Sequence, residues 1–335
     1  MSDWKSLLRS DPTDWLLQED NPSVRYLALL DLCDKSSSDD DVQGARQDIM
    51  TRGMVPHILQ LQDTSDYRAW RTRFYTNKYR GLVWQLIVLA ELAAENVPTI
   101  AEQCEYLLSH SQELHSGGFS QNRAARTGGG RLSEVIPCLT GNMAWALMRF
   151  GYLSDPRIQK AVEWLTAHMR FNDGIELVPQ DEPYSRFEIC WGRHSCHMGV
   201  VKGLKALAEI PKDQRGPQIN RTIDSAVEYI LLHHVYRRSH DLRRLSKPGW
   251  RKLSFPLMYQ TDILEILDIL TRLGVRDARM QDAVSVVLSK QNEHGRWSNE
   301  NSYTNERLLV PLEQPDQESK WLTLRALRVL RRYFT

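Results

Sequence analysis

The stretch Gln291-Asn292-Glu293-His294-Gly295-Arg296-Trp297 is a glycine-aromatic turn that follows an apolar helix end at 285–290. Weaker copies of the turn occur earlier, as Ser116-Gly117-Gly118-Phe119 and Asn172-Asp173-Gly174-Ile175. These copies again follow helix ends of similar pattern, at 105–110 and 163–168, and a further such end lies at 228–233. A unit that recurs at intervals of roughly 60 residues indicates a fold built from repeated helical hairpins.

A second type of helix is expected after each turn and its loop. Apolar residues recur there at helical spacing, as in 83–92 and 263–270, whereas the alternation typical of strands is nearly absent. The sequence therefore predicts an all-α protein whose repeat is a helix, a glycine turn, a loop and a second helix. The second helices are expected to begin near Tyr79, Thr140, Cys196, Tyr259 and Lys320.

The spacing of Gln291, Gly295 and Trp297 resembles the QW motif of the squalene cyclase and protein prenyltransferase superfamily. That resemblance implies an (α/α)6 toroid, in which an outer ring of helices surrounds an inner ring with a central cavity. We expect one domain over residues 1–335, with residues 1–50 as an N-terminal helical part and residues 50–335 as recognisable repeats. In size the chain is most similar to single-domain class II terpene cyclases.

Composition limits the partners and the location. The chain has 43 basic and 42 acidic residues, so its net charge of +1 argues against a protein that coats nucleic acid. No apolar run approaches the roughly 20 residues that span a bilayer, and the first residues show no secretory signal. Five cysteines, an odd number, are typical of a reducing compartment. We expect a cytoplasmic protein and leave open a peripheral contact with a membrane.

The starts of the second helices are the expected ligand-binding region, because in such a toroid they face the mouth of the cavity. Most of these starts carry an aromatic residue, and aromatic faces stabilise cations. Packing between helices is the alternative explanation for any one of these residues. The predicted substrate-binding residues are Tyr79, Trp84, Trp145, Trp191, Arg193, Lys320 and Trp321.

A cation-forming cyclase also needs an acid. Class II cyclases of the superfamily use a DxDD motif, which this sequence lacks; its nearest string, 38–41, is better explained as a helix cap. Asp262 is the predicted proton donor, since it is expected one turn into an inner helix, an apolar run follows it, and burial would keep a carboxyl protonated. Tyr259 and His194 are predicted to act beside it. The alternative is that Asp262 is an ionised carboxylate at a helix start.

Two further acids, Glu188 and Glu318, are weaker candidates for the proton donor. The densest group of metal-binding residue types is Cys190-xxx-His194-x-Cys196-His197. The prenyltransferase β-subunits of the superfamily bind zinc through Asp, Cys and His, but the spacing here is not that of a standard zinc site. No DDxxD-type cluster is suitably placed either. We therefore predict neither a metal nor a cofactor.

Basic residues are concentrated in 237–252, where Asp241 is the one acid. Such a run suits an anionic membrane surface or a diphosphate group. A solvated basic loop that neighbouring acids neutralise is the alternative.

The resulting hypothesis is a class II terpene cyclase-like enzyme, which would cyclise a long apolar isoprenoid or meroterpenoid in an aromatic-lined cavity after protonating it. Two alternatives remain open. One is a non-catalytic toroid that binds an isoprenoid or a protein partner. The other is a zinc-dependent prenyl transfer subunit.

Overall fold

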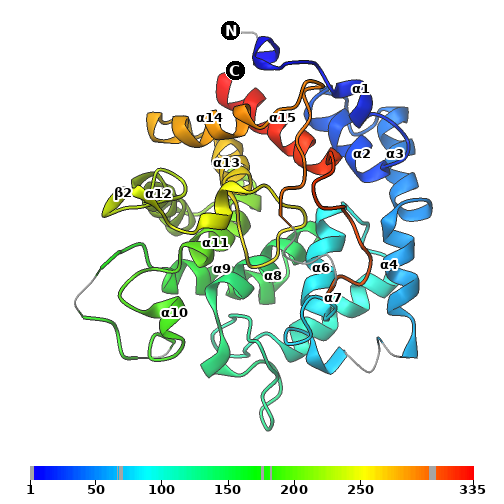
Figure 1. The fold of residues 1–335 in the computed structure, drawn as a ribbon. Coiled ribbons are helices and arrows are strands. Elements are labelled where there is room, and N and C mark those ends of the chain that lie inside the picture. The colour runs from blue at the N-terminus through cyan, green and yellow to red at the C-terminus, as the bar shows by residue number, and fades with distance from the viewer. Residues whose placement is uncertain (1–3, 66, 68–70, 175–176, 182, 302–306) are drawn as a thin grey trace.

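The computed structural model describes residues 4–65, 67, 71–174, 177–181, 183–301 and 307–335, without the side chain of Glu188. The chain is mostly helical, which confirms the all-α prediction (Figure 1). Within the described ranges, the only named strands are β1 (Arg237–Arg238) and β2 (Asp241–Leu245), which pair as an antiparallel hairpin inside the basic run.

The helices are short to medium in length, and several are separated by long connections, at 111–136, 233–262 and 290–319. The α-helices are α1 (Thr13–Leu16), α2 (Pro22–Asp31), α3 (Asp40–Thr51), α4 (Met54–Gln62), α6 (Leu82–Glu91), α7 (Pro98–His110), α8 (Pro137–Arg149), α9 (Pro156–His168), α10 (Glu188–Trp191), α11 (His197–Glu209), α12 (Pro217–Leu232), α13 (Ile263–Arg272), α14 (Gln281–Ser289) and α15 (Lys320–Phe334). The 3-10 helices are η1 (Trp4–Leu7), η2 (Arg71–Arg73), η3 (Leu132–Glu134), η4 (Lys212–Gln214), η5 (Pro248–Arg251) and η6 (Ala278–Met280).

Local sequence signals set several helix starts. Asn21 caps α2 by accepting a hydrogen bond of 3.2 Å from the backbone N–H of Val24, and Pro22 takes the first helical position. Proline has no N–H to lose there, and the same arrangement begins α7, α8, α9 and α12. Asp39 caps α3, as expected for the acidic string at 38–41.

The sequence repeats are also structural repeats. The backbone N–H of Phe119 donates to the hydroxyl of Thr140 in α8 at 2.9 Å, and that of Trp297 donates to Thr323 in α15 at 3.0 Å. Two of the three glycine-aromatic turns are thereby fixed to the helix that follows them, and Ile175 of the turn at 172–175 lies outside the described residues. The degenerate turn at 116–119 therefore has the same anchoring contact as the intact one.

The first helices of the repeats show a second shared contact. Arg157 near the start of α9 forms a bidentate ion pair with Glu105 of α7, at 2.7 and 2.9 Å. Arg279 forms the same pair with Glu228 of α12, at 2.8 and 3.0 Å. Glu105 and Glu228 occupy equivalent positions of the sequence repeat, so equivalent residues make equivalent bonds between successive repeats.

The intact turn also joins the two ends of the chain. The side-chain oxygen of Gln291 accepts from the backbone N–H of Arg9 at 3.0 Å. The fully buried indole of Trp297 donates to the carbonyl of Val287 at 2.7 Å. The final helix α15 packs against η1, α1 and α2. The first and last parts of the chain therefore share one apolar core, which extends from Trp4 to Leu330.

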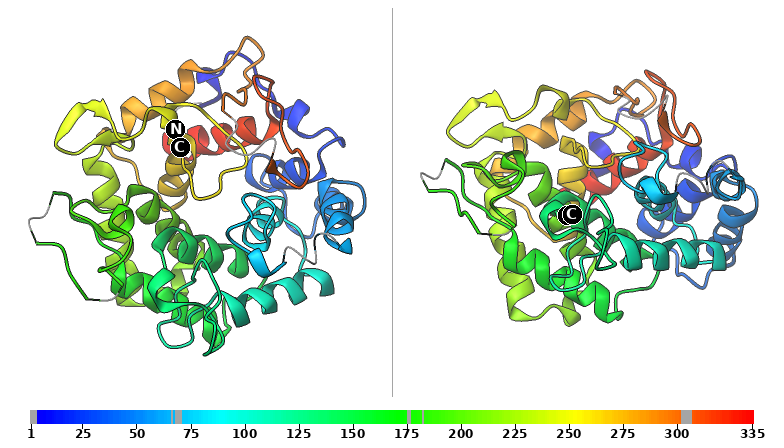
Figure 2. Two further views of the ribbon diagram at one scale, coloured as in Figure 1. Left: turned by 60° about the horizontal axis from the view of Figure 1, so that its bottom comes forward. Right: turned by 90° about the horizontal axis from the view of Figure 1, so that it is seen from below.

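The second helices of the repeats pack on one another in chain order: α6 on α8, α8 on α11, α11 on α13, and α13 on α15 (Figure 2). The contact between α8 and α11 is especially close because of a glycine. A Cβ atom at Gly141 would lie 2.5 Å from the backbone of Lys202, so no larger residue fits at this crossing. In the described part of the chain, no helix is both long and apolar enough to cross a membrane.

Candidate functional site

Two cysteines meet at the start of α11. Cys196 is the N-cap residue of this helix, and Cys190 lies in α10. Both side chains line one small pocket there. Hydrogen bonding with the Cys190 thiol is the main cause that lowers the pKa of Cys196, and the backbone N–H groups of Met198 and Gly199 add to it against the effect of burial. Cys196 therefore forms a thiolate readily, whereas the same bond and burial raise the pKa of Cys190.

A third thiol, that of Cys138, lies at the start of the neighbouring helix α8. A Cβ atom at Gly199 would lie 2.9 Å from the ring of Pro137, so the close packing of α8 and α11 also brings their first turns together. Burial raises the pKa of Cys138 to about 12, and the charge of Cys196 adds to this rise. Cys138 therefore stays a neutral thiol beside the more acidic Cys196.

An aromatic cluster surrounds the ammonium group of Lys78 close to these thiols. The Lys78 nitrogen lies 4.2 Å from the ring centroid of Tyr259, 4.8 Å from that of Tyr75 and 5.4 Å from that of Trp84. Burial lowers the pKa of Lys78, and the neighbouring Cys138 opposes this shift. The hydroxyl groups of Tyr79 and Tyr259 lie 3.5 Å apart. Three predicted residues, Tyr79, Trp84 and Tyr259, therefore do come together, around an amine.

A cavity of about 400 Å³ opens on another side of Cys196. Its wall is rich in imidazole groups, and it also holds a carboxylate, that of Asp173, and an ammonium group, that of Lys247. These residues come from the loops before α10 and α11, from α12 and from the β1–β2 hairpin. The histidines of the wall are His194, His197, His233 and His240.

Asp173 organises this group of imidazoles. It forms short hydrogen bonds with the Nδ1 of His194 and the hydroxyl of Ser239, and the Nε2 of His233 lies 3.4 Å from its second oxygen. Burial raises the pKa of Asp173, but these partners outweigh it and keep the pKa below the ordinary value. Asp173 is therefore ionised. The predicted residue His194 lies here, with 58% of its side chain exposed.

His197 is the group in this wall with unused bonding capacity. Both of its ring nitrogens are buried without a hydrogen-bond partner among the described residues. Its ring packs against Trp250, Tyr229 and His233, at centroid distances of 4.6, 5.4 and 4.7 Å. Burial lowers its pKa well below the ordinary value. A neutral imidazole with a free N–H and a free lone pair can bind or exchange a proton with a molecule in the cavity.

The basic run is partly neutralised. Arg237 pairs with Asp282 at 2.7 Å and Arg243 with Asp241 at 3.1 Å. Lys247, by contrast, extends along the wall of the cavity. Membrane contact through 237–252 stays a prediction.

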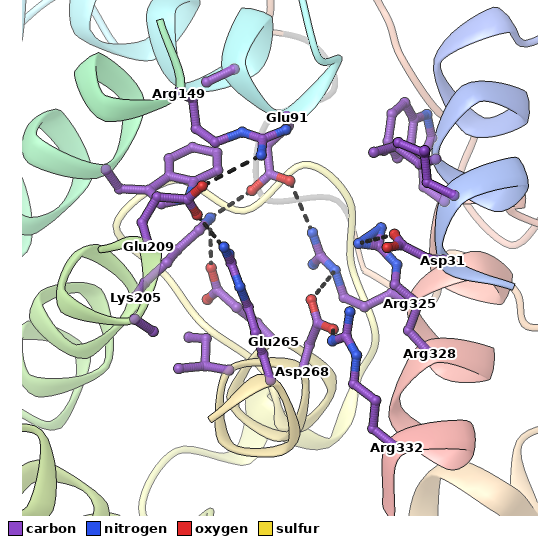
Figure 3. A pocket seen from close by; sticks show the side chains of 18 of the residues that line it. Asp31, Glu91, Arg149, Lys205, Glu209, Glu265, Asp268, Arg325, Arg328 and Arg332 are labelled. Atoms are coloured by element: carbon purple, nitrogen blue, oxygen red, sulfur yellow. Dashed lines mark hydrogen bonds and ion pairs between the residues drawn. The ribbon is translucent and has the colours of Figure 1, made fainter. Parts of the chain in front are cut away.

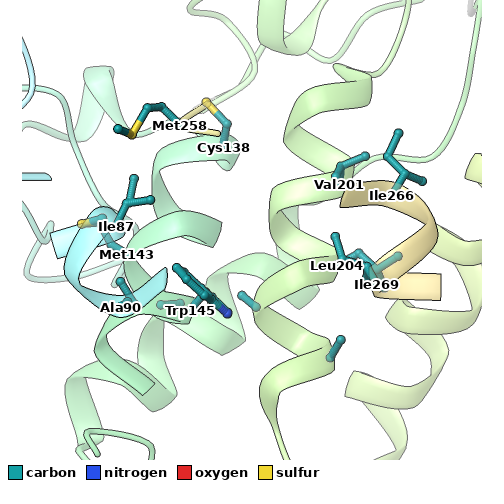
Figure 4. Close-up of a cluster of buried hydrophobic side chains, with 14 of the residues drawn as sticks. Ile87, Ala90, Cys138, Met143, Trp145, Val201, Leu204, Met258, Ile266 and Ile269 are labelled. Carbon is teal, nitrogen blue, oxygen red and sulfur yellow. The ribbon is translucent and has the colours of Figure 1, made fainter. Parts of the chain in front are cut away.

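A second cavity, of about 270 Å³, lies where α2, α6, α8, α11, α13 and α15 meet (Figure 3). Of the predicted aromatic residues, Trp145 and Trp321 line it, and the ammonium of Lys205 lies 3.7 Å from the Trp145 ring centroid. Its wall is dominated by charged side chains, which the sequence analysis did not foresee. An apolar side-chain cluster from α6, α8, α11 and α13 faces inward beside it (Figure 4).

The charges of this second cavity form a connected network. Lys202, fully buried just behind the wall, donates to both oxygens of Glu265 at 2.7 Å. Glu91 accepts from Lys205 at 2.6 Å and from Arg325 at 3.1 Å. Burial raises the pKa of Glu91, but these cations outweigh it and hold the pKa at about 2. The sequence signal that could have located this network is a pair of charged residues three positions apart in an otherwise apolar helix, as in Lys202 and Lys205.

Asp262 proves to be the N-cap of α13 and not a residue within it. Its two oxygens accept backbone N–H bonds, from Glu265 at 2.8 Å and from Ser254 at 2.9 Å. Burial raises its pKa to about 6 even though these bonds oppose the shift. Asp262 lies outside the walls of both cavities described above. Of the weaker candidates, Glu318 pairs with Arg296 at 2.7 Å, and the side chain of Glu188 lies outside the described part.

The remaining predicted residues lie apart from one another. Trp191 is buried against Trp164 and Tyr184, at centroid distances of 6.0 and 5.2 Å. Arg193 is exposed on the loop before α11. Lys320, at the start of α15, forms an ion pair with Asp20 in the N-terminal part of the chain. The residues predicted to surround one cavity are therefore divided among several places.

Within the described ranges, no three or more His, Cys, Asp or Glu side chains are arranged to hold a metal ion. What the site near Cys196 offers is an acidic thiol, a second thiol bonded to it, and a cavity with imidazole and ammonium groups. No protein-family model and no curated protein matches the chain.

Proposed function

We propose that the protein is a thiol-dependent enzyme that exchanges electrons with a disulfide substrate through Cys190 and Cys196. The observation that carries the proposal is the meeting of Cys190 and Cys196 in one small pocket, with Cys196 at the N-cap of α11 and in the wall of a cavity of about 400 Å³. The interaction of the two thiols lowers the pKa of Cys196 and raises that of Cys190. A thiolate is the reactive form of cysteine, and backbone N–H groups at a helix start favour it. Both cysteines are partly exposed, so a substrate can approach them.

The reaction has two steps. The Cys196 thiolate attacks one sulfur of the substrate disulfide, forms a mixed disulfide and releases the other half as a thiolate. Attack removes the negative charge from Cys196, so Cys190 no longer has a thiolate to which it donates. The Cys190 thiol then loses its proton to the departing thiolate and attacks Cys196, which releases the second half of the substrate.

Overall, one enzyme dithiol and one substrate disulfide react to give one enzyme disulfide and two thiols. Two electrons pass from the enzyme to the substrate, and a second thiol compound restores the dithiol by the reverse steps. Lys247 and Arg238 of the wall favour a substrate that carries negative charge, and Lys247 also stabilises the Cys196 thiolate.

A stoichiometric reaction with a disulfide reagent tests this function. In a Cys33→Ser background, the reduced protein should release two equivalents of aromatic thiolate from 5,5′-dithiobis(2-nitrobenzoate) through the Cys190–Cys196 pair. Cys190→Ser should release one equivalent and retain a mixed disulfide, and Cys196→Ser should react slowly. Equal release by all three proteins would overturn the proposal.

The helices, we also propose, close into an α/α toroid. The order of contacts supports this arrangement, because α15 packs both on α13 and on α2, and the chain ends are joined through Gln291. The second cavity described above, of about 270 Å³ and called the central cavity from here on, supports it as well. Its wall is formed by α2 and by the second helix of each repeat, namely α6, α8, α11, α13 and α15.

A second candidate function is the proton-initiated cyclisation of an isoprenoid or meroterpenoid. One observation favours it: Asp262 is fully buried, with a pKa of about 6, and a raised pKa is what a general acid needs. The test is single-turnover conversion of a geranylgeranylated substrate by Asp262→Asn and by the unaltered protein.

A further inference from the structure

The central cavity of about 270 Å³ is separate from the cysteine site. The hydrogen-bond acceptors and donors of its charged side chains are not equally occupied. Six basic and five acidic side chains line its described wall. Each of the most buried acids is shared by two cations. Glu91 bonds Lys205 and Arg325, and Glu265 bonds Lys202 and Lys205. The acceptors in the wall are therefore largely occupied.

The donors of the wall, in contrast, are not all occupied. Arg325 is only 6% exposed, and its Nη1 has no hydrogen-bond partner within the described residues. Arg328, one turn further along α15, has a buried Nε that also lacks a partner there. Buried N–H groups of a guanidinium are costly to leave unpaired. Two arginines of one helix thus offer free donors next to the same cavity.

Among the described residues, the ends of the surrounding helices do not bond the free donors. The last residues of α2, α6, α8, α11 and α13 line the cavity, so these helix ends add partial negative charge to it. Arg149 and Arg272 lie in two of those last turns. Arg325 and Arg328 lie within α15 and not in its last turn, which holds Arg331 and Arg332. Their free donors are therefore available for something other than a helix end.

We propose that the central cavity binds a small anion with several oxygen acceptors, of the phosphate or polycarboxylate type, at Arg325 and Arg328. Such an anion supplies the acceptors that the wall lacks, and guanidinium groups bind phosphate and carboxylate oxygens in a matching geometry. An apolar molecule in this place would leave the donors unpaired. The side chain of Trp145 lies in the same wall and reports on occupancy.

Titration calorimetry at constant ionic strength tests the proposal, with inorganic phosphate in one arm and citrate in the other. The unaltered protein should bind at least one of the two, and the arm that binds identifies the type of anion. Arg328→Gln should weaken this binding about 10-fold or more. Both arginines pair with an acid, Arg328 with Asp31 at 3.3 Å and Arg331 with Asp34 at 2.6 Å. Arg331→Gln is the matched control, because Arg331 lies on the same helix but outside the wall of the cavity. It should change the affinity less than twofold.

Absence of binding in both arms, or equal weakening by the two variants, would overturn the proposal. If Arg328→Gln does not fold, the tryptophan fluorescence of the unaltered protein tests anion binding instead. Addition of the anion should change its tryptophan emission, and the double variant Trp145→Phe/Trp321→Phe, which removes both tryptophans of the wall, should remove that change. An unchanged emission, or a change that survives the double variant, would contradict binding in this cavity.

Discussion

Cys190 and Cys196, the N-cap residue of α11, line one small pocket. Their interaction moves the pKa values of the two thiols in opposite directions. Cys196 becomes the group that attacks, and Cys190 stays protonated until the charge on Cys196 has gone. The proposed reaction depends on this division of roles.

The alkylation rate of Cys196 should depend on pH with a midpoint at neutral pH. The Cys190 hydrogen bond and the helix N–H groups lower its pKa from 9.0 to about 7. At neutral pH the lower pKa raises the thiolate fraction by more than the lower basicity reduces the nucleophilicity, so Cys196 should be alkylated faster than an ordinary cysteine. The measurement is iodoacetamide labelling followed by peptide mass spectrometry.

Cys33 provides the internal control for this labelling. It is also partly exposed, and burial raises its pKa, so its labelling should rise only at alkaline pH. Cys190→Ala should move the midpoint for Cys196 upward, because it removes the thiol donor. If Cys196 and Cys33 show the same pH profile, the hydrogen bond does not activate Cys196.

Lys202→Met should destabilise the fold by about 3–5 kcal/mol, because it leaves Glu265 buried with half of its partners. The double variant Lys202→Met/Glu265→Leu should recover a large part of that loss. Lys212→Met, at an exposed lysine, should change stability by no more than about 0.5 kcal/mol. Urea unfolding of the three variants measures these differences. A single variant as stable as the double one would show that the pair is not coupled.

Protonation of the Glu91 carboxylate should contribute to the unfolding of the protein at acidic pH. Its pKa is held at about 2, below the ordinary 4.5, so its contribution is present above pH 4.5 and is lost as the pH falls toward 2. The shift corresponds to about 3 kcal/mol. Glu91→Gln should be less stable at neutral pH and should lose less stability on acidification. Parallel curves of stability against pH for the two proteins would contradict this role.

The parts of the fold that could be predicted from the sequence depend on local signals. The turn ending at Trp297 indicated a repeat of helical hairpins, and the acidic string at 38–41 indicated a helix cap, which Asp39 provides for α3. The cysteine site was recognised only as a group of residue types. Its geometry depends on Gly141 and Gly199, which bring two helix starts together, and no local pattern expresses that.

The carboxylate of Asp173 shows a second kind of feature that the sequence does not predict, a contact between residues from different segments. It meets His194, His233 and Ser239, which are distant from it in the sequence, so their meeting follows from how the loops and α12 pack. The charged cavity was missed because Lys202 and Glu265 lie in apolar helices, where an ionic network is the exception. The aromatic residues were assigned to one cavity because they share a position in the repeat, but their side chains point to different neighbours.

Asp262→Asn separates capping from acid catalysis. Asn keeps one acceptor oxygen, for the backbone N–H of Glu265 or that of Ser254, and its amide then faces the other N–H. We expect a loss of stability of about 1–3 kcal/mol and an unchanged alkylation rate of Cys196. Thermal melting and labelling measure both. A cyclisation activity that falls about 10²–10⁴-fold in this variant would favour the second candidate function instead.

The most direct test of the thiol-dependent function is a peptide mass map of the reduced protein after brief exposure to oxidised glutathione. The account predicts a disulfide between Cys190 and Cys196, and a glutathione adduct that accumulates on Cys196 only in Cys190→Ser. A stable adduct on Cys196 in the unaltered protein, or preferential reaction at Cys33, would contradict it.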